Sequence, residues 1–453
     1  MKGYYDLPDV RARMAEFLGS APVEDGTAVY VTGKPGVPGA PDTTPVPSAR
    51  VGTILDRNHE VARSLWDRHQ LVVDLDIEYV NFDFPAEAYL EPGRSFGLQR
   101  PVVRAVRALL ARWGIEPLHV LSGRGHHFFW AVPRHSDAFD RLVEMGPLPP
   151  SLAGRYRAPH PPSGAAVDEA LGRAWAGLGL VMEYLGHRLR ETAGPESAIP
   201  VELGDLEPEW ATRGREVVAI DLSEYGDPLP SRFVTIPFSR YLKPLRDRPR
   251  LGDHAVRRLP GIFTIPDPGV SEGEAIRLMR EEAGAAEVAR RIRSRIPSAP
   301  ANGGSPPAGE AQSDESPAGM SALVEEYAGS PLADFHRHFY GAEHDPPEIW
   351  HRTYDRTPLH PLSPPARAAL ARPNDLLLKP RMILEVVREL VGAGWHPRHI
   401  AGLIRSRYER PYGWGERWYR DDATARADHY VRLFSGMLAL GRSPGTPPWP
   451  TGP

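Results

Sequence analysis

The sequence contains no cysteine, only four lysines and no long apolar run. The absence of cysteine excludes disulfides, thiolate zinc sites, iron–sulfur clusters and cysteine nucleophiles, so any metal must be bound by oxygen or imidazole ligands. No apolar run reaches the ~18 residues that span a bilayer, and the N-terminus is too polar for a signal peptide. We therefore expect a cytoplasmic protein that does not bind membranes.

The charges nearly balance, with 54 basic against 58 acidic side chains and a net charge of −4. A surface that binds nucleic acid must therefore be local and cannot be a property of the whole chain. At ~150 residues per domain, the length of 453 residues indicates about three structural units.

Composition and periodicity divide the chain into five parts. Residues 1–50 form an N-terminal extension and loop, 51–295 a mixed α+β domain, 296–320 a linker, 321–443 a small all-α domain, and 444–453 a tail. Because the linker is rich in Pro, Gly, Ser and Ala and has no hydrophobic period, we expect it to be flexible and the two halves to move independently.

Local patterns predict the elements within these parts. A short apolar run occupies 28–31, strands are expected at 71–79, 118–121, 127–132, 216–221 and 232–237, and helices at 9–18, 58–69, 99–113, 165–192, 271–293, 382–393, 396–408 and 422–440.

The first chemical motif is the strand Val72 to Glu78. Strand alternation places Asp74, Asp76 and Glu78 on one face. Carboxylates this close repel one another unless a cation lies between them, and oxygen ligands favour magnesium or manganese. The alternative is a half-exposed strand whose polar face is acidic.

The second motif is the turn Ser122-Gly-Arg124-Gly-His126-His127. Its two glycines allow close backbone approach, while Ser122, Arg124 and His127 supply hydrogen-bond donors suited to phosphate. We expect His127 to be functional and His126 to point to the opposite face. A glycine-rich hairpin with surface histidines is the alternative.

The third motif begins at Asp221, which closes an apolar strand as a metal-binding carboxylate would. Downstream, Arg232, Ser239 and Lys243 could converge on a triphosphate. Each of these could equally be an ordinary loop residue.

In this order, the three motifs resemble the archaeo-eukaryotic primase superfamily, the primase-polymerases. They appear here as Asp74-Leu-Asp76, Ser122-Gly-Arg-Gly-His-His127, Asp221 and Arg232…Ser239…Lys243, and cover residues 51 to 260. The resemblance implies an RRM-like catalytic core with helical insertions. It also implies that Asp74, Asp76 and Asp221 are catalytic ligands of two divalent ions, Mg²⁺ or Mn²⁺. Nucleotide phosphates would then be bound by Ser122, Arg124, His127, Arg232, Ser239 and Lys243.

The chain departs from this family in several places. Thr235 stands where many relatives have a second arginine, and Lys243-Pro244-Leu245 replaces the usual Lys-Thr-Gly ending. Cysteine zinc knobs cannot exist. Nothing matches the phosphate-binding loop of a helicase, so we expect a helicase to act in trans.

The C-terminal part combines arginines with aromatic side chains between residues 381 and 420. This combination suits single-stranded nucleic acid, so the domain could hold the template or primer; an ordinary helical bundle is the alternative. The aromatic residues are Trp395, Tyr408, Tyr412, Trp414, Trp418 and Tyr419.

A histidine-rich segment precedes this part. It lacks an i, i+4 histidine pair beside a glutamate, so we expect a surface connection, or a surface for a protein partner, in preference to a metal site. Its histidines are His336, His338, His344, His351 and His360.

The sequence thus predicts a DNA primase-polymerase that uses NTPs or dNTPs on a single-stranded DNA template. Two alternatives stay open: a metal-dependent nuclease that uses the same carboxylates, and a non-catalytic DNA-binding protein of replication initiation or defence. Dependence on nucleoside triphosphates distinguishes the polymerase from the nuclease. DNA binding that survives loss of the carboxylates, without synthesis, would identify the third.

Overall fold

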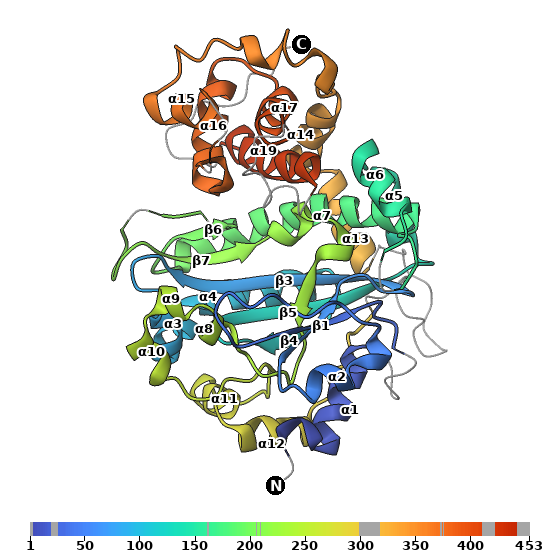
Figure 1. Ribbon diagram of the computed structural model, residues 1–453, viewed down its shortest axis with the longest axis vertical. Coiled ribbons are helices and arrows are strands. Elements are labelled where there is room, and N and C mark those ends of the chain that lie inside the picture. The colour runs from blue at the N-terminus through green and yellow to red at the C-terminus, as the bar shows by residue number, and fades with distance from the viewer. Residues whose placement is uncertain are drawn as a thin grey trace, which may run out of the picture.

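The computed structural model is a mixed α+β fold with two sheets and a helical C-terminal region (Figure 1). It describes residues 3–19, 26–160, 163–204, 206–208, 210–298, 318–371, 374, 376–409 and 422–441. The α+β class and the C-terminal helices predicted from the sequence are therefore confirmed.

The larger sheet has six strands in the order β6-β7-β3-β5-β4-β9, and all neighbours are antiparallel except β6 and β7. The twelve-residue strand β3 lies between β5 and β7 and is buried along most of its length because its apolar residues meet core on one face. The strands are β3 (Gln70–Asn81), β4 (Leu118–Leu121), β5 (Gly125–Pro133), β6 (Val201–Leu203), β7 (Glu216–Asp221) and β9 (Ile265–Pro266).

The smaller sheet corrects one prediction. Residues 58–69, predicted as a helix, contain strand β2 (Glu60–Ser64), which pairs with β1 (Val31–Lys34) and β8 (Phe233–Thr235). All five residues of β2 are buried, including Arg63, whose guanidinium donates to Asp67 at 2.7 Å. This pairing with distant strands overrides the local helical pattern.

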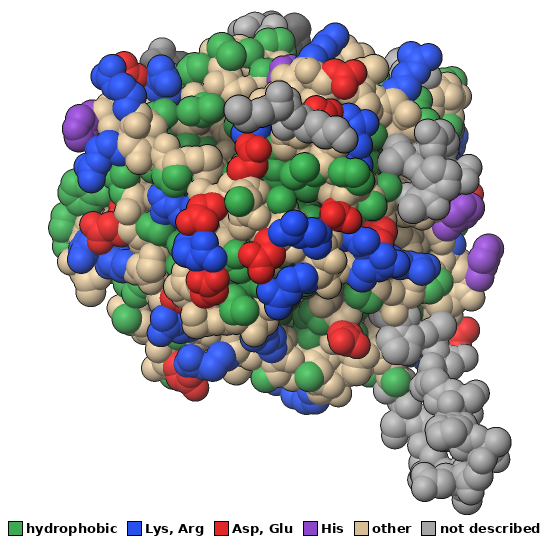
Figure 2. Space-filling view, turned by 90° about the horizontal axis from the view of Figure 1, so that it is seen from below, with side chains coloured by type: hydrophobic (Ala, Val, Ile, Leu, Met, Phe, Trp, Pro, Cys, Tyr) green, Lys and Arg blue, Asp and Glu red, His purple; other side chains and the backbone are tan. Residues whose placement is uncertain are grey.

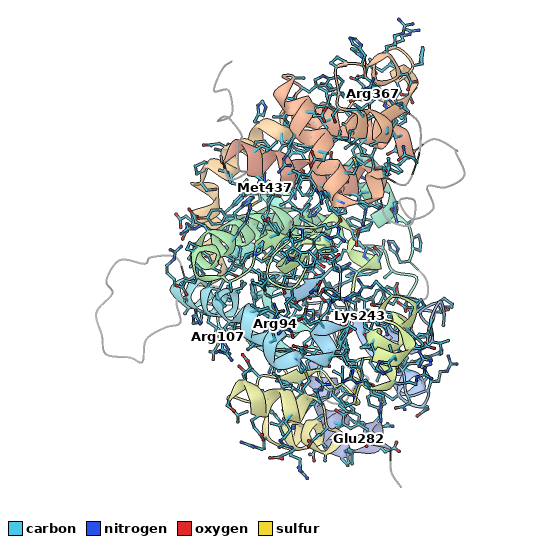
Figure 3. All side chains as sticks on the ribbon, turned by 90° about the vertical axis from the view of Figure 1, so that its left-hand side faces the viewer. Arg94, Arg107, Lys243, Glu282, Arg367 and Met437 are labelled. Atoms are coloured by element: carbon cyan, nitrogen blue, oxygen red, sulfur yellow. The ribbon has the colours of Figure 1, made fainter. Side chains whose placement is uncertain are left out.

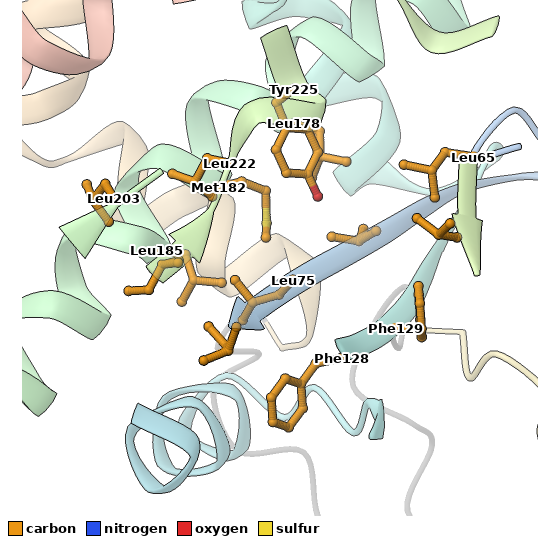
Figure 4. Packing of buried hydrophobic residues seen from close by; sticks show 14 of the residues in the cluster. Leu65, Leu75, Phe128, Phe129, Leu178, Met182, Leu185, Leu203, Leu222 and Tyr225 are labelled. Atoms are coloured by element: carbon orange, nitrogen blue, oxygen red, sulfur yellow. The ribbon is translucent and has the colours of Figure 1, made fainter. Parts of the chain in front are cut away.

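Two long helices, α4 (Pro92–Arg112) and α7 (Glu169–Ala193), pack against each other and against β3. Asp168 begins α7 by accepting a hydrogen bond from the Leu171 amide at 3.1 Å. Figure 4 shows Met182 and Leu185 of α7 beside Leu75 of β3, and Leu178 of α7 beside Tyr225. This packing fixes the strand that carries the first motif.

Shorter helices surround this core. The helix predicted at 271–293 is two helices, with Ser271 capping the first as expected and a break at Arg280 and Glu281. The helices are α1 (Pro8–Phe17), α2 (Gly52–Leu55), α3 (Glu87–Leu90), α5 (Asp137–Met145), α6 (Pro150–Arg157), α8 (Lys243–Arg246), α9 (Arg248–Leu251), α10 (Asp253–Arg257), α11 (Glu272–Met279) and α12 (Glu282–Arg291).

The C-terminal helices are packed onto the core, in contrast to the expected independence of the two halves. In Figure 1, α7 lies between them and the sheet. The buried guanidinium of Arg432 in α19 donates to Glu183 of α7 at 2.8 Å. Most of the predicted linker lies outside the described residues. The helices are α13 (Met320–Ala328), α14 (Pro331–Tyr340), α15 (Pro364–Ala371), α16 (Pro380–Gly392), α17 (Pro397–Tyr408) and α19 (Ala423–Ala439).

Two observations concern the exterior. Within the described ranges, no helix combines the length and the apolar character needed to cross a bilayer. Figure 2 shows Lys and Arg side chains interspersed with Asp and Glu on the face seen from below, so that face carries no large field of one sign.

Candidate active site

Three sequence motifs meet on the three central strands of the larger sheet. Asp76 of β3 lies directly opposite Asp221 at the end of β7 and opposite His127 of β5. The predicted grouping of Asp74, Asp76, Asp221 and His127 is therefore present in the fold. It arises because β3 is the middle strand, so its two neighbours present side chains to the same residue.

His127 lies between the two aspartates of the first motif. Its Nδ1 is 3.1 Å from Asp74 Oδ1 and its Nε2 is 3.7 Å from Asp76 Oδ1. Burial alone would lower the pKa of His127, but Asp76 and Asp74 outweigh it and raise the pKa to about 10. The imidazole is therefore protonated at neutral pH and supplies a positive charge between the carboxylates.

Glu78 continues the acidic face of β3 and binds two cations. Arg124 of the glycine-rich turn donates to its carboxylate, and Lys243 Nζ lies 3.5 Å from Glu78 Oε1. Although burial would raise the pKa of Glu78, Arg124 and Lys243 lower it to about 2. The second and third motifs thus both reach the strand that carries the first.

The turn between β4 and β5 is closed by a hydrogen bond from the Ser122 amide to the Gly125 carbonyl at 2.9 Å. Ser122 is buried, and its hydroxyl oxygen has no hydrogen-bond partner among the described residues. A Cβ on Gly125 would lie 2.0 Å from the Ile77 carbonyl oxygen, so only glycine allows this approach to β3.

His126 points away from this cluster, as predicted. Its Nδ1 is 2.9 Å from Nε2 of His119. The other ring nitrogen of His119, Nδ1, is 3.0 Å from Asp267 Oδ2. Burial lowers the pKa of both histidines. Of the two adjacent histidines of the turn, His127 alone takes part in the acidic cluster.

The segment after Asp221 adds residues that the sequence did not single out. Its first turn, η5 (Ser223–Gly226), begins where the Ser223 amide donates to Asp221 Oδ1 at 2.8 Å. The Tyr225 hydroxyl donates to the Asp74 carbonyl at 2.6 Å. Glu224 is buried, with its Oε2 3.7 Å from Nε of Arg232. The sequence signals this segment only by its acidic residues, Asp221, Glu224 and Asp227, which follow one another at a spacing of three.

Arg232 belongs to the same electrostatic cluster. Burial would lower its pKa, but Glu224 and Asp221 outweigh this and raise the pKa above its usual value. Burial and the charge of Asp74 raise the pKa of Glu224 well above normal, and Arg232 opposes this effect. The guanidinium is held beside Glu224 and Asp227, within the electrostatic reach of Asp221 and Asp74.

The negative charge of Asp76 is poorly balanced by positive charge, since His127 is the named cation that opposes the rise in its pKa. Burial raises its pKa well above the usual value; His127 opposes this effect, while Glu78, Asp74 and Asp221 add to it. Its Oδ1 lacks a hydrogen-bond partner in the described part of the chain, yet its side chain is 15% exposed. The unpaired oxygen itself is buried, but it belongs to a carboxylate that is partly exposed and lies beside further carboxylates, a setting that fits a divalent cation.

The side chains as they lie do not form a finished metal site. Over the described residues, no group of three or more His, Asp or Glu side chains is arranged so that it could hold an ion. His127 contacts Asp74 and lies near Asp76, so its ring takes the place that a cation would need. A bound cation would therefore have to displace this imidazole.

Ser239 is the predicted site residue that lies apart from the cluster. It is fully buried, and its hydroxyl oxygen accepts a hydrogen bond from the Val61 amide at 2.7 Å and donates to the Arg240 carbonyl at 3.0 Å. These bonds tie β2 to the segment after β8. Its hydroxyl is thus already committed to the fold, which the pattern in the sequence could not reveal.

The C-terminal candidates are only partly described. Tyr408 is buried and presents no open ring for stacking, whereas Trp395 is half-buried and lines a surface hollow with Tyr354 and His399. Tyr412, Trp414, Trp418 and Tyr419 lie outside the described residues. The expectation of a surface segment for the histidines is wrong for His336 and His344.

His336 is buried, the side chain of His344 is buried although the residue as a whole is half-exposed, and each pairs with a carboxylate. His336 Nε2 is 3.2 Å from Glu183 Oε1, and His344 Nε2 is 2.8 Å from Asp428 Oδ1. His336 therefore links α14 to α7, and His344 links the segment after α14 to α19.

The chain matches no protein-family model, no curated protein and no solved structure.

Proposed function

We propose that the protein is a primase-polymerase that transfers nucleotides from nucleoside triphosphates on a single-stranded DNA template. The observation that carries the proposal is the position of Asp76, opposite Asp221 on one side and His127 on the other, with Arg124, Arg232 and Lys243 around them. A central antiparallel strand that carries the carboxylates also supports an RRM-like primase core.

The roles follow from charge. Asp74, Asp76 and Asp221 would hold two divalent ions, Mg²⁺ or Mn²⁺, and these ions would stabilise negative charge at the reacting phosphorus. Arg124, His127, Arg232 and Lys243 now neutralise carboxylates and would exchange these partners for the phosphates of the incoming nucleotide. Ser122 offers a buried hydroxyl for which the described part of the chain supplies no hydrogen-bond partner.

The reaction is a nucleotidyl transfer. The terminal 3′-hydroxyl oxygen attacks the α-phosphorus, a new P–O bond forms, the bond to the β-phosphate oxygen breaks, and pyrophosphate leaves while the hydroxyl proton passes to solvent. The side chains of this site contribute by orientation and electrostatics, so a lost carboxylate should cost more than a lost phosphate contact. We further propose that a separate helicase supplies the single strand in a cytoplasmic setting.

The test is nucleotide incorporation on a single-stranded DNA template, with and without primer, in magnesium and in manganese. We expect product from the wild type and none from Asp76→Ala. The matched control is Asp253→Ala, which removes an exposed carboxylate on α10.

Other outcomes would refute the proposal. Degradation of the template without nucleotides would identify a nuclease. Equal template binding by wild type and Asp76→Ala, with no synthesis by either, would identify a non-catalytic DNA-binding protein.

A further inference from the structure

The segment after Asp221 is held between the sheet and the C-terminal helix α19. On the sheet side, Tyr225 donates to the Asp74 carbonyl. On the other side, Gly226 packs against the ring of His429, and a Cβ at this glycine would lie 2.8 Å from His429 Cγ. A side chain at position 226 would therefore push α19 away from this segment.

One carboxylate in this segment connects the two parts of the chain. Asp227 Oδ2 accepts a hydrogen bond from Nη1 of Arg232 at 3.3 Å, and its Oδ1 accepts one from Nη1 of Arg426 in α19 at 2.7 Å. The Asp227 side chain is 11% exposed, so water screens these contacts only weakly.

Arg426 projects from a helix that is itself fixed. Six residues further along α19, Arg432 donates to Glu183 of α7 at 2.8 Å and to the Tyr340 hydroxyl at 2.7 Å. The position of Arg426 relative to the sheet is therefore set by buried contacts, and a change at Arg426 should leave α19 in place.

We propose that Arg426 is a positioning residue for nucleotide binding, acting through Asp227 on Arg232. With Arg426 present, two guanidinium groups share the charge of Asp227. Without it, Asp227 loses the hydrogen bond that competes with Arg232, which draws the Arg232 guanidinium toward Asp227 and away from an incoming phosphate. The inference rests on the proposed function, because it assigns the phosphate contact to Arg232.

The first test compares steady-state nucleotide incorporation by Arg426→Ala, Arg426→Lys and the wild type. We expect Arg426→Ala to raise KM for the nucleotide about 3- to 10-fold, because the contact between Arg232 and the phosphate is weakened but not lost, with kcat within about twofold. Arg426→Lys should recover most of the loss. The matched control is Arg367→Ala, on α15, which Figure 3 places at the far end of the C-terminal helices.

A second variant distinguishes an effect transmitted through Asp227 from a general loss of structure. In an Asp227→Asn background, Arg426→Ala should change KM by less than about twofold, because the shared charge is already gone and the two effects are not additive. Additive effects would overturn the proposal, as would an unchanged KM in Arg426→Ala.

A third measurement does not need activity. Amide hydrogen exchange over residues 222–231 should be faster in Arg426→Ala and unchanged in Arg367→Ala. Unchanged exchange in both would overturn the positioning role. If exchange is faster in Arg426→Ala but the wild type incorporates no nucleotide, both the polymerase proposal and the role of Arg426 in nucleotide binding are refuted. The contact between Arg426 and Asp227 would then be structural only.

Discussion

At the scale of single residues, the site places one carboxylate where its negative charge is poorly balanced. Asp76 has an elevated pKa from burial and from Glu78, Asp74 and Asp221, despite the nearby His127. Because the folded state disfavours the ionised form of Asp76, this side chain lowers the stability of the fold. Such a loss of stability is common at sites that bind a cation.

The substitution Asp76→Asn tests this conclusion. The amide has the same shape without the charge, so the variant should be more stable than the wild type by about 1 kcal/mol, which raises the unfolding temperature by about 1 °C, and should lose nucleotide incorporation. Thermal unfolding and the incorporation assay check both parts. A lower melting temperature would show that the Asp76 charge stabilises the fold.

Gly125 allows a second prediction at this scale. Because a Cβ there would meet the Ile77 carbonyl at 2.0 Å, Gly125→Ala should force β5 away from β3 and cost about 1–3 kcal/mol of stability. Gly273→Ala in α11, where a Cβ meets nothing within 4 Å, should instead stabilise by about 0.5–1 kcal/mol. Denaturant unfolding of both variants measures the difference.

Much of the site could be predicted from single residues, because strand alternation alone places Asp74, Asp76 and Glu78 on one face. Glu224, Tyr225 and Asp227 could not, since their roles depend on contacts with β3 and α19. Ser239 is the opposite case. Its motif predicts a phosphate contact, but its hydroxyl oxygen accepts a hydrogen bond from the Val61 amide inside the fold.

At the scale of elements, the contact between α7 and α19 includes a buried ion pair between Glu183 and Arg432. Arg432→Met would leave Glu183 buried with His336 as its remaining named ionic partner, so we expect a loss of about 3–5 kcal/mol. Arg337→Met, which breaks an exposed pair with Asp334 on α14, should cost less than about 1 kcal/mol. Calorimetry of both variants tests this contrast, and similar losses would contradict it.

The predictions of secondary structure are wrong where tertiary contacts outweigh the local sequence pattern. Residues 60–64 become β2 because β1 and β8 flank them and because Arg63 finds Asp67 inside the core. The helix predicted at 271–293 breaks in two. By contrast, β4 and β7 have the predicted bounds, because short apolar runs between turn signals leave few alternatives.

At the scale of the whole molecule, buried titratable groups set the response to acid. Burial, together with the charge of Arg432, lowers the pKa of His429 to about 3. The unfolded chain takes up this proton near pH 6.5 and the folded chain does not, so the free energy of unfolding should fall as the pH decreases from about 6.5 to 3. Glu78, with its pKa of about 2, adds a loss below about pH 4.5.

The prediction is checked by urea unfolding at pH 7.5 and at pH 5.5. The wild type should be less stable at pH 5.5, and His429→Leu, which cannot bind the proton, should lose less stability over the same interval. An identical decrease in both proteins would mean that His429 does not contribute.

The bond between Asp227 and Arg426 also has a consequence for the order of events during synthesis. Its two partners lie 199 residues apart in the chain, and a ribosome makes the carboxylate long before the guanidinium. A nascent chain can thus form the sheet with its aspartates while the segment beyond Asp221 still lacks its support. We expect full affinity for the nucleotide to arise only after α19 has been made and has docked, so that unfinished chains bind the nucleotide weakly.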